Sequence, residues 1–313
     1  MKTSKVIFRY VTYKRALGYR FCAEEAILRA FSISINDKPI ATIGKQDVLT
    51  FLNGSGPITV TWGKKHRVLS GLFRFLISRG LAEFSPMPTV IPKSTVTPFV
   101  PYIYSHDELR RLLNAVPDAC GGRASIEDYV FRALILLLYG AGLRIGEALA
   151  LTLEDVDLEE AYCCVRETKF FKSRLVPLGG DLKGVLTDYL AQRNKSYGSA
   201  RDASVFCSCN GLPLSQSSVR SAFRRLRSHA GVLREGGPRR QPRLHDLRHT
   251  AAVHRLSAWY RSGEDMHQLL PKLATYLGHL DLSGTQCYLT LTPELLSQAS
   301  QRFERYVMEP NHD

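Results

Sequence analysis

The sequence predicts a mainly α-helical chain of the α+β class, with one small β-hairpin and two domains. Apolar residues recur at helical spacing through most of the 313 residues, which indicates amphipathic helices. Five prolines fall from Pro86 to Pro101, too densely for a helix or a central strand, and indicate an extended linker over residues 86–103. The linker separates a helical domain at residues 1–85 from a second domain at residues 104–313. In the second domain, two short alternating stretches flank a basic turn, as in a hairpin.

Four helices are expected in the first domain. Residues Val6–Phe31 carry the helical pattern twice, with a break at Gly18, and Lys45–Leu52 carries it over a shorter stretch. A longer helix is expected over Val60–Ser78, because its apolar residues form one stripe while basic residues occupy the other faces. This part of the chain is therefore expected to form a small all-helical bundle.

The charge of the chain is strongly positive and unevenly divided. The formal net charge is +13, and residues 1–100 hold 15 Lys and Arg against 5 Asp and Glu. A positive field attracts nucleic acid or an anionic membrane alike, and basic residues can also serve solubility alone. Together with the motif described below, so lopsided a division favours contact with DNA by the first domain. Candidate phosphate contacts on the long helix are Lys64, Lys65 and Arg67, with an ordinary solvated face as the alternative.

The cysteines and apolar runs indicate a soluble protein of a reducing compartment. Seven cysteines, an odd number, include no Cys-x-x-Cys pair, which argues against a zinc site and against a disulfide framework. The apolar run after Lys5 is too short for a signal peptide, and Ala133–Leu143, broken by Gly140, is too short to span a bilayer. We therefore expect a cytoplasmic location, no membrane partner and no metal.

The second domain is expected to begin with three helices. Ser105 suits the cap of a helix that runs to about Val116, and Ser125 suits the cap of a longer apolar helix. A glycine turn ends the apolar helix, and Arg144 heads the next one. Glu147 lies three residues further on, close enough to orient Arg144 by a salt bridge.

A β-hairpin and two further helices follow. Residues 161–166 and 175–178 alternate and flank a basic tip that carries Lys169 and Lys172. Helices are expected over Asp181–Asn194 and over Ser215–His229. On the second of these, and just after it, basic residues form candidate contacts to a DNA backbone: Arg220, Arg224, Arg227, Arg239 and Arg240.

The segment from Leu244 to Tyr288 gathers residues that suit phosphate chemistry. His245 and Arg248 lie three apart and share a face if the segment is helical. Pro271 suits the first turn of a short helix, and Gly278 suits its left-handed cap. Arginine donates to two phosphate oxygens at once, histidine moves protons near neutral pH, and a tyrosine hydroxyl can attack phosphorus.

The chain resembles the tyrosine recombinase, or integrase, family. The resemblance rests on His245-x-x-Arg248, on a Leu-Gly-His that ends at His279, on Tyr288 nine residues later, and on an upstream arginine box around Arg144. Two features depart from the family pattern: the 31-residue spacing from Arg248 to His279, and the lack of a histidine two residues after Tyr288.

The resemblance implies a core-binding domain, a catalytic domain and a function. The implied function is a site-specific DNA recombinase or integrase that works through a 3′-phosphotyrosyl intermediate without metal, ATP or another cofactor. Tyr288 is then the nucleophile, and His245 assists its deprotonation. Lys169, with Lys172 as the alternative, is the general acid. The implied stabilisers of the phosphorus are Arg144, Arg248 and His279, with Glu147 behind Arg144.

The resemblance also implies partners. These are double-stranded DNA and a homo-tetramer on paired sites, with a monomer or dimer off DNA, and accessory recombination proteins are further candidates. A final helix after Thr292 is expected to dock either on its own domain or into a neighbouring subunit. A transposon-encoded member of the family fits this pattern. Two alternatives stay open, a type IB topoisomerase-like enzyme and a non-catalytic DNA-binding regulator.

Overall fold

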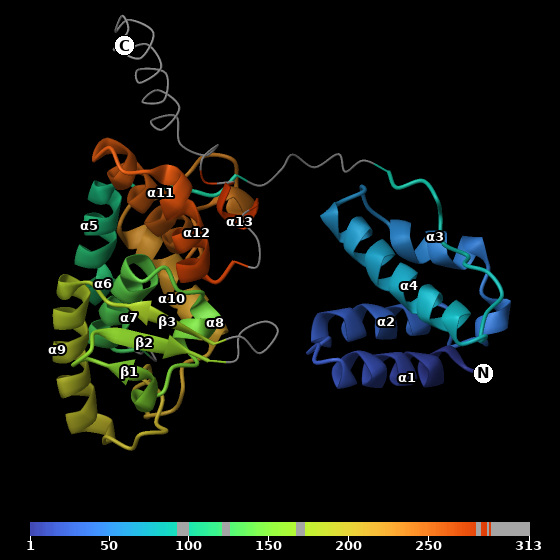
Figure 1. The fold of residues 1–313 in the computed structure, drawn as a ribbon, viewed down its shortest axis with the longest axis horizontal. Helices are drawn as coiled ribbons and strands as arrows, with labels where there is room; N and C mark the ends of the chain where they lie inside the picture. Colours follow the sequence, from blue (N-terminus) through green and yellow to red (C-terminus); the bar gives the residue numbers. More distant parts are fainter. Residues whose placement is uncertain (93–99, 121–125, 167–172, 280–282, 287, 289–313) are drawn as a thin grey trace, which may run out of the picture. The chain divides into compact units, whose positions relative to one another are not determined.

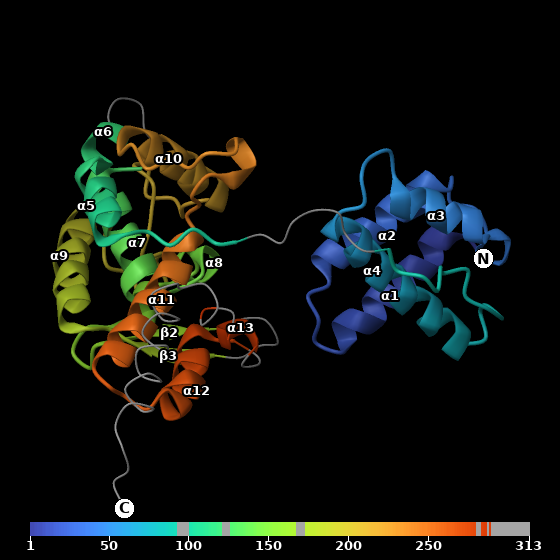
Figure 2. The same cartoon turned by 90° about the horizontal axis from the view of Figure 1, so that it is seen from above.

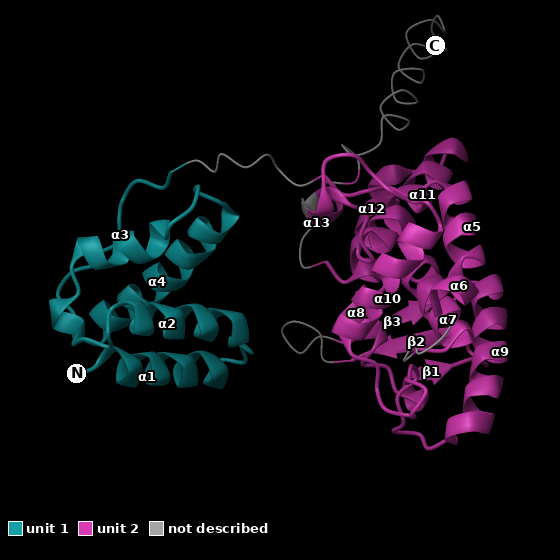
Figure 3. Cartoon of the chain, turned by 180° about the vertical axis from the view of Figure 1, so that it is seen from behind, with its two compact units in different colours: residues 1–99 teal, residues 100–313 magenta. Residues whose placement is uncertain are grey.

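The computed structural model describes residues 1–92, 100–120, 126–166, 173–279, 283–286 and 288 of the chain. The chain divides into two compact units, Met1–Phe99 and Val100–Asp313 (Figure 3). The described elements are mostly helices with one small antiparallel sheet, so the predicted fold class is confirmed (Figure 1).

Unit 1 is a helical bundle. Its helices are α1 (Thr3–Ala16), α2 (Cys22–Ser34), α3 (Lys45–Asn53) and α4 (Val60–Ser78), with a short 3-10 turn at Ile40–Thr42. The predicted break between the first two helices is present, since Gly18 has a φ of 84°. All four helices contribute to the core, and Leu28, Phe31 and Leu69 are completely buried in it.

Unit 2 begins with α5 (His106–Asn114), α6 (Val116–Cys120), α7 (Asp128–Gly140) and α8 (Ile145–Ala148). Ser105 caps α5 as predicted, because its hydroxyl accepts from the Glu108 N–H at 3.1 Å. The predicted cap at Ser125 lies outside the described residues, and Glu127 stands at the N-cap of α7. The helix α6 was not predicted.

The sheet has three antiparallel strands in the order β1-β2-β3. They are β1 (Val156–Asp157), β2 (Tyr162–Val165) and β3 (Arg174–Pro177). The predicted hairpin is β2 with β3, in a register that pairs Cys163 with Val176. The strand β1 was not predicted. Residues 167–172 at the tip, with both candidate lysines, lie outside the described residues.

The remaining elements complete unit 2. They are α9 (Gly180–Tyr197), α10 (Gln216–His229), a 3-10 turn at Pro238–Arg240, α11 (Asp246–Arg261), α12 (Met266–Leu277) and α13 (Ser283–Gln286). The helix α7 packs against α6, α8, α9 and α11 and forms the centre of the unit (Figure 2). In the described ranges, no helix combines the length and the apolar character that crossing a membrane requires. The helix expected after Thr292 lies outside those ranges.

The helix before Gly278 begins earlier than predicted. The helix α12 begins at Met266, because the Asp265 side chain accepts from the His267 N–H at 2.9 Å and caps it there. Pro271 therefore lies inside α12 and not in its first turn, and the helix lacks one backbone N–H at that point. The left-handed cap is confirmed, since Gly278 has φ 67° and ψ 43°.

Two glycines of α4 allow a matched test of packing in unit 1. A Cβ added at Gly71 would lie 2.6 Å from the hydroxyl of Tyr10, whose buried ring packs edge-on against Phe21. A Cβ added at Gly63 would meet no atom within 4 Å.

We expect Gly71→Ala to destabilise unit 1 by roughly 1–2 kcal/mol, because overpacking outweighs the helix-propensity gain. Gly63→Ala should stabilise it by roughly 0.5–1 kcal/mol, since only the propensity gain remains. Urea unfolding of the full chain, followed by Trp62 fluorescence in a Trp259→Phe background, measures both. If both substitutions changed the free energy of unfolding in the same direction, this account would be contradicted.

Candidate active site

Arg144 and Glu147 form the first part of the site, at the start of α8. The Glu147 carboxylate accepts from the Arg144 backbone N–H at 2.9 Å and from its Nη1 at 2.6 Å. The expected ion pair between the two residues is therefore present. The same carboxylate closes the N-terminus of the helix, so the fold of this turn and the orientation of Arg144 are determined together.

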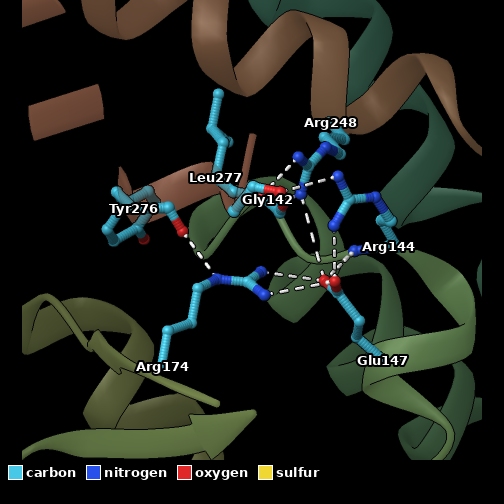
Figure 4. A network of polar contacts seen from close by, with 8 residues as sticks. Gly142, Arg144, Glu147, Arg174, Arg248, Tyr276 and Leu277 are labelled. Carbon is cyan, nitrogen blue, oxygen red and sulfur yellow. Dashed lines mark hydrogen bonds and ion pairs between the residues drawn. The ribbon is translucent and has the colours of Figure 1, made fainter. Parts of the chain in front are cut away.

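Two more arginines approach the same carboxylate (Figure 4). Arg174, at the start of β3, donates to it from Nη1 at 3.2 Å and from Nη2 at 2.9 Å. Nη1 of Arg248, on α11, lies 4.0 Å from Glu147 Oε2. Burial alone would raise the pKa of Glu147, but hydrogen bonds from Arg174 and from the Arg144 backbone lower it to about 2. The carboxylate is therefore charged throughout the neutral range.

The C-terminal end of α12 holds the same three arginines from another side. The last carbonyls of a helix lack partners within it and carry a partial negative charge. The carbonyl of Tyr276 accepts from Arg174 Nε at 3.0 Å, that of Leu277 from Arg248 Nη2 at 2.5 Å, and that of Gly278 from Arg144 Nη2 at 3.0 Å (Figure 4). Three successive carbonyls thus each bind one guanidinium.

Two features require a glycine at position 278: its backbone conformation and the lack of room for a Cβ. Its φ of 67° is in the left-handed region that favours glycine. A Cβ at this position would also lie 2.8 Å from Nη1 and 2.9 Å from Cζ of Arg174. A larger residue here would displace Arg174 from its hydrogen bonds to Glu147 and Tyr276.

Arg144 and Arg248 differ in how far their side chains are exposed to solvent. The side chain of Arg248 is 3% exposed and also donates to the carbonyl of Gly142 at 2.6 Å. Burial and the charge of Arg144 lower the pKa of Arg248 to about 10, against the opposing effect of Glu147 and Tyr288. The side chain of Arg144 is 40% exposed and presents the more accessible guanidinium.

His279 follows directly after the cap of α12. Its Nδ1 lies 2.7 Å from the hydroxyl of the buried Thr285, on α13. Its ring lies nearly parallel to that of Tyr288, with centroids 6.1 Å apart and an interplanar angle of 27°. The fold therefore brings His279 and Tyr288 together.

Tyr288 is 1% exposed and packs among apolar residues of α11 and α12, including Leu256 and Leu277. Its hydroxyl lies 3.1 Å from Nδ1 of His249. The ring of His249 in turn packs edge-on against His245, with centroids 4.8 Å apart. The hydroxyl is thus held by a histidine other than the one predicted to assist it.

His245 stands at the N-cap of α11 and remains solvent-exposed. Partial burial and the charges of Arg248 and Arg243 lower its pKa. Asp246 opposes this lowering of the pKa, and Arg144 adds to it. That His245 and Arg248 face one ligand stays a prediction.

The predicted DNA contacts of unit 1 differ in their surroundings. Lys64 and Arg67 line a hollow between α1 and α4, with a volume near 950 Å³, together with Lys14 and Arg74. Lys64 and Arg67 are exposed. Lys65 Nζ instead donates to the Phe51 carbonyl at 2.8 Å and so ties α4 to α3.

The predicted basic stripe on α10 is only partly on the surface. Arg220 and Arg224 are exposed and bind side chains of their own helix. Arg227 is half-buried and donates to the Pro242 carbonyl at 2.7 Å, because the chain after α10 folds back over it. Arg240 is exposed, and the side chain of Arg239 lies outside the described residues.

Sequence reasoning missed two residues of the site, Arg174 and His249. Arg174 belongs to a lysine-rich hairpin tip, where a solvated arginine is the ordinary expectation. His249 does carry a signal, since it lies one helical turn after His245 and directly after Arg248. Among the described residues, no three His, Cys, Asp or Glu side chains gather as metal ligands.

Comparison with known proteins gives consistent matches. Residues 103–294 match the phage integrase family. A protein of Sinorhizobium fredii named integrase/recombinase y4rB is 34% identical, over 96% of both chains. The tyrosine recombinase XerC of Thermodesulfovibrio yellowstonii is 31% identical over 76% of this chain and 72% of its own.

Solved structures share the fold. The Tn1549 transposon integrase in complex with transposon right end DNA gives a TM-score of 0.70 at 17% identity, over 97% of this chain and 99% of that one. A lambda integrase dimer bound to a COC′ core site gives a TM-score of 0.65 at 19% identity, over 92% of this chain and 77% of that one.

The position of Glu147 predicts a large effect of one substitution. We expect Glu147→Gln to destabilise unit 2 by about 3 kcal/mol, because it leaves three guanidinium groups without their shared anion. Glu154→Gln is the matched control, since Glu154 is 40% exposed and lies 3.8 Å from Arg166. Urea unfolding followed by Trp259 fluorescence, in a Trp62→Phe background, compares them. Equal changes in the free energy of unfolding for the two variants would show that the arginines do not depend on Glu147.

Proposed function

The chain belongs to the phage integrase family of tyrosine recombinases and is therefore a site-specific DNA recombinase, and we propose that it acts through a 3′-phosphotyrosyl intermediate on Tyr288. The reaction proposed here uses neither a metal ion nor ATP. The observation that carries the proposal is the gathering of Arg144 and Arg248 on Glu147 and on the end of α12, directly before His279.

The proposed reaction exchanges one phosphoester for another. The Tyr288 Oη attacks the scissile phosphorus, an Oη–P bond forms, and the bond from phosphorus to the 5′-oxygen breaks. The product is a 3′-phosphotyrosyl link and a free 5′-hydroxyl. Because the link keeps the ester energy, the reverse attack by a 5′-hydroxyl of another strand rejoins DNA without an energy source.

Positive groups stabilise the reacting phosphorus, which gathers negative charge on its nonbridging oxygens. Arg144, Arg248 and His279 are proposed for this role, each worth roughly 3 kcal/mol by analogy with oxyanion holes. The accessible guanidinium of Arg144 supports the proposal, because it is fixed by Glu147 and Gly278 and still 40% exposed. His245 is proposed to assist the deprotonation of Tyr288.

Lys169 is proposed to protonate the departing 5′-oxygen, with Lys172 as the alternative. Both residues belong to the tip between β2 and β3, and the support comes from the family pattern alone. The lysine acts as a general acid, so its effect should depend on the basicity of the leaving atom.

The proposed substrate is double-stranded DNA held by both units. Exposed basic residues support this: Lys64 and Arg67 in unit 1, and Arg220, Arg224 and Arg240 in unit 2. Lys65, Arg227 and Arg239 remain proposed contacts as well. Unit 1 is proposed to be the core-binding domain, residues 1–85, joined by the linker 86–103 to the catalytic domain, residues 104–313.

The working assembly is proposed to be a homo-tetramer on paired sites, with a monomer or dimer off DNA. Solved relatives of the same fold include a lambda integrase tetramer bound to a Holliday junction. A helix predicted after Thr292 is proposed to dock on its own domain or into a neighbouring subunit. A cytoplasmic location, accessory recombination proteins and an origin in a transposon belong to the same proposal.

The first test is the covalent adduct. Nicked suicide duplexes that tile the DNA on both sides of the gene are incubated with the chain and resolved by denaturing gel electrophoresis. We expect an adduct with the parent chain and none with Tyr288→Phe, because the attacking oxygen is gone.

The control for this test is Tyr139→Phe, which removes another hydroxyl, partly buried, that lies 2.9 Å from a histidine, His254. It should form the adduct normally. Equal adducts from the parent and Tyr288→Phe would remove Tyr288 from the reaction, and no adduct from the parent would favour a binding-only regulator. Relaxation of one plasmid without exchange between two duplexes would favour a topoisomerase.

A sulfur leaving atom tests the general acid. We expect Lys169→Ala to slow adduct formation by roughly 10²–10⁴-fold on an ordinary duplex. On a duplex with sulfur in place of the bridging 5′-oxygen, its rate should approach that of the parent, because a thiolate leaves without a proton. Lys172→Ala is the matched control and should be normal on both duplexes. The opposite pattern would assign the acid to Lys172.

A further inference from the structure

His249 contacts the atom that the proposed reaction uses as its nucleophile. Its Nδ1 lies 3.1 Å from the Tyr288 hydroxyl, within the range over which a general base takes a proton. The residue belongs to the first turns of α11, one position after Arg248. The contact is therefore built on a rigid element that also carries a proposed phosphate-binding group.

The surroundings of His249 keep it uncharged. Burial and the neighbouring His245 lower its pKa to about 4, and Arg243 and Arg248 act in the same direction. Asp246 acts in the opposite direction but does not outweigh them. At neutral pH the ring is neutral, so one of its nitrogens carries a free electron pair. A charged ring could not accept a proton.

We propose that His249 is a further catalytic residue, which holds the Tyr288 hydroxyl through Nδ1 and takes up its proton during the attack on phosphorus. The inference rests on the proposed role of Tyr288. As the Oη–P bond forms, the Oη–H bond breaks and the proton passes to Nδ1, while the 5′-oxygen leaves with a proton from a separate acid. In the rejoining step, His249 returns the proton to Oη.

The low basicity of His249 suits a concerted transfer. A phenol becomes far more acidic once its oxygen begins to bond to phosphorus, so the acceptor needs to be well placed more than strongly basic. The role proposed for His245 is compatible with this arrangement. Its ring packs edge-on against that of His249, so the two proposed groups are neighbours.

Two substitutions separate proton transfer from simple positioning. In His249→Asn, the amide reaches the place of Nδ1 and can bind the hydroxyl but takes up no proton. In His249→Leu, both functions are lost. We expect both variants to form the adduct roughly 10²–10⁴-fold more slowly than the parent at pH 7, in single-turnover assays on the suicide duplex that the parent cleaves.

The pH profile and the leaving atom give readouts that a structural role would not move. Without His249, solvent must remove the proton, so the rate of both variants should rise up to about tenfold per pH unit between pH 6 and 9. The parent profile should be flatter. Both variants should stay slow on the duplex with a 5′-sulfur, because the defect lies in the attack and not in the departure.

The matched control is His254→Asn, on the same helix. Nδ1 of His254 lies 2.9 Å from the Tyr139 hydroxyl, so this substitution alters a similar histidine–tyrosine pair outside the site. It should leave the adduct rate unchanged. Gel-shift affinity for the duplex and far-UV circular dichroism, matched to the parent, establish that the variants fold and bind.

The outcomes distinguish the two levels of the proposal. Parent-like rates and pH profile in His249→Asn would overturn the proton-transfer role, and parent-like rates in His249→Leu would overturn any role of His249. An adduct from the parent that survives Tyr288→Phe would instead overturn the proposed function, since the nucleophile would then be another group.

Discussion

The attraction of three guanidinium groups to one carboxylate and one helix end is the interaction on which the rest of unit 2 depends. Arg144, Arg174 and Arg248 come from three distant parts of the chain and would repel one another if nothing lay between them. Glu147 supplies a full negative charge, and the end of α12 supplies carbonyls that lack partners within the helix. The arrangement joins α8, β3, α11 and α12 at one point.

This junction also determines what each group can do for a substrate. Arg174 is 11% exposed and is bound by Glu147 and the Tyr276 carbonyl, so it holds the structure together, whereas Arg144 is 40% exposed. His279 follows directly after the carbonyl that Arg144 binds, and Tyr288 lies against its ring. The proposed nucleophile, its histidine neighbours and the accessible arginine are therefore positioned by the same few contacts that stabilise the fold.

The sequence allowed much of this to be predicted where spacing alone carries the information. The bounds of α4 and the cap at Gly278 follow from local periodicity and turn chemistry, and both are confirmed. The position of Arg174 depends on a carboxylate 27 residues earlier and a carbonyl 102 residues later, which no local pattern encodes. Strand β1 is two residues long, too short for a recognisable alternation. The start of α12 was misjudged because its cap at Asp265 outweighs the proline inside it.

The close approach of Gly278 to Arg174 has a consequence for how such a chain can be changed or recombined with relatives. Neither position can be substituted alone. A side chain at position 278 would clash with the Arg174 guanidinium. A shorter residue at position 174 would remove hydrogen bonds that stabilise the charge of Glu147. A chimera that imports the hairpin from another protein therefore has to import its partners too. The smallest transplantable piece is not a contiguous segment but a set of contacts spread over half the chain.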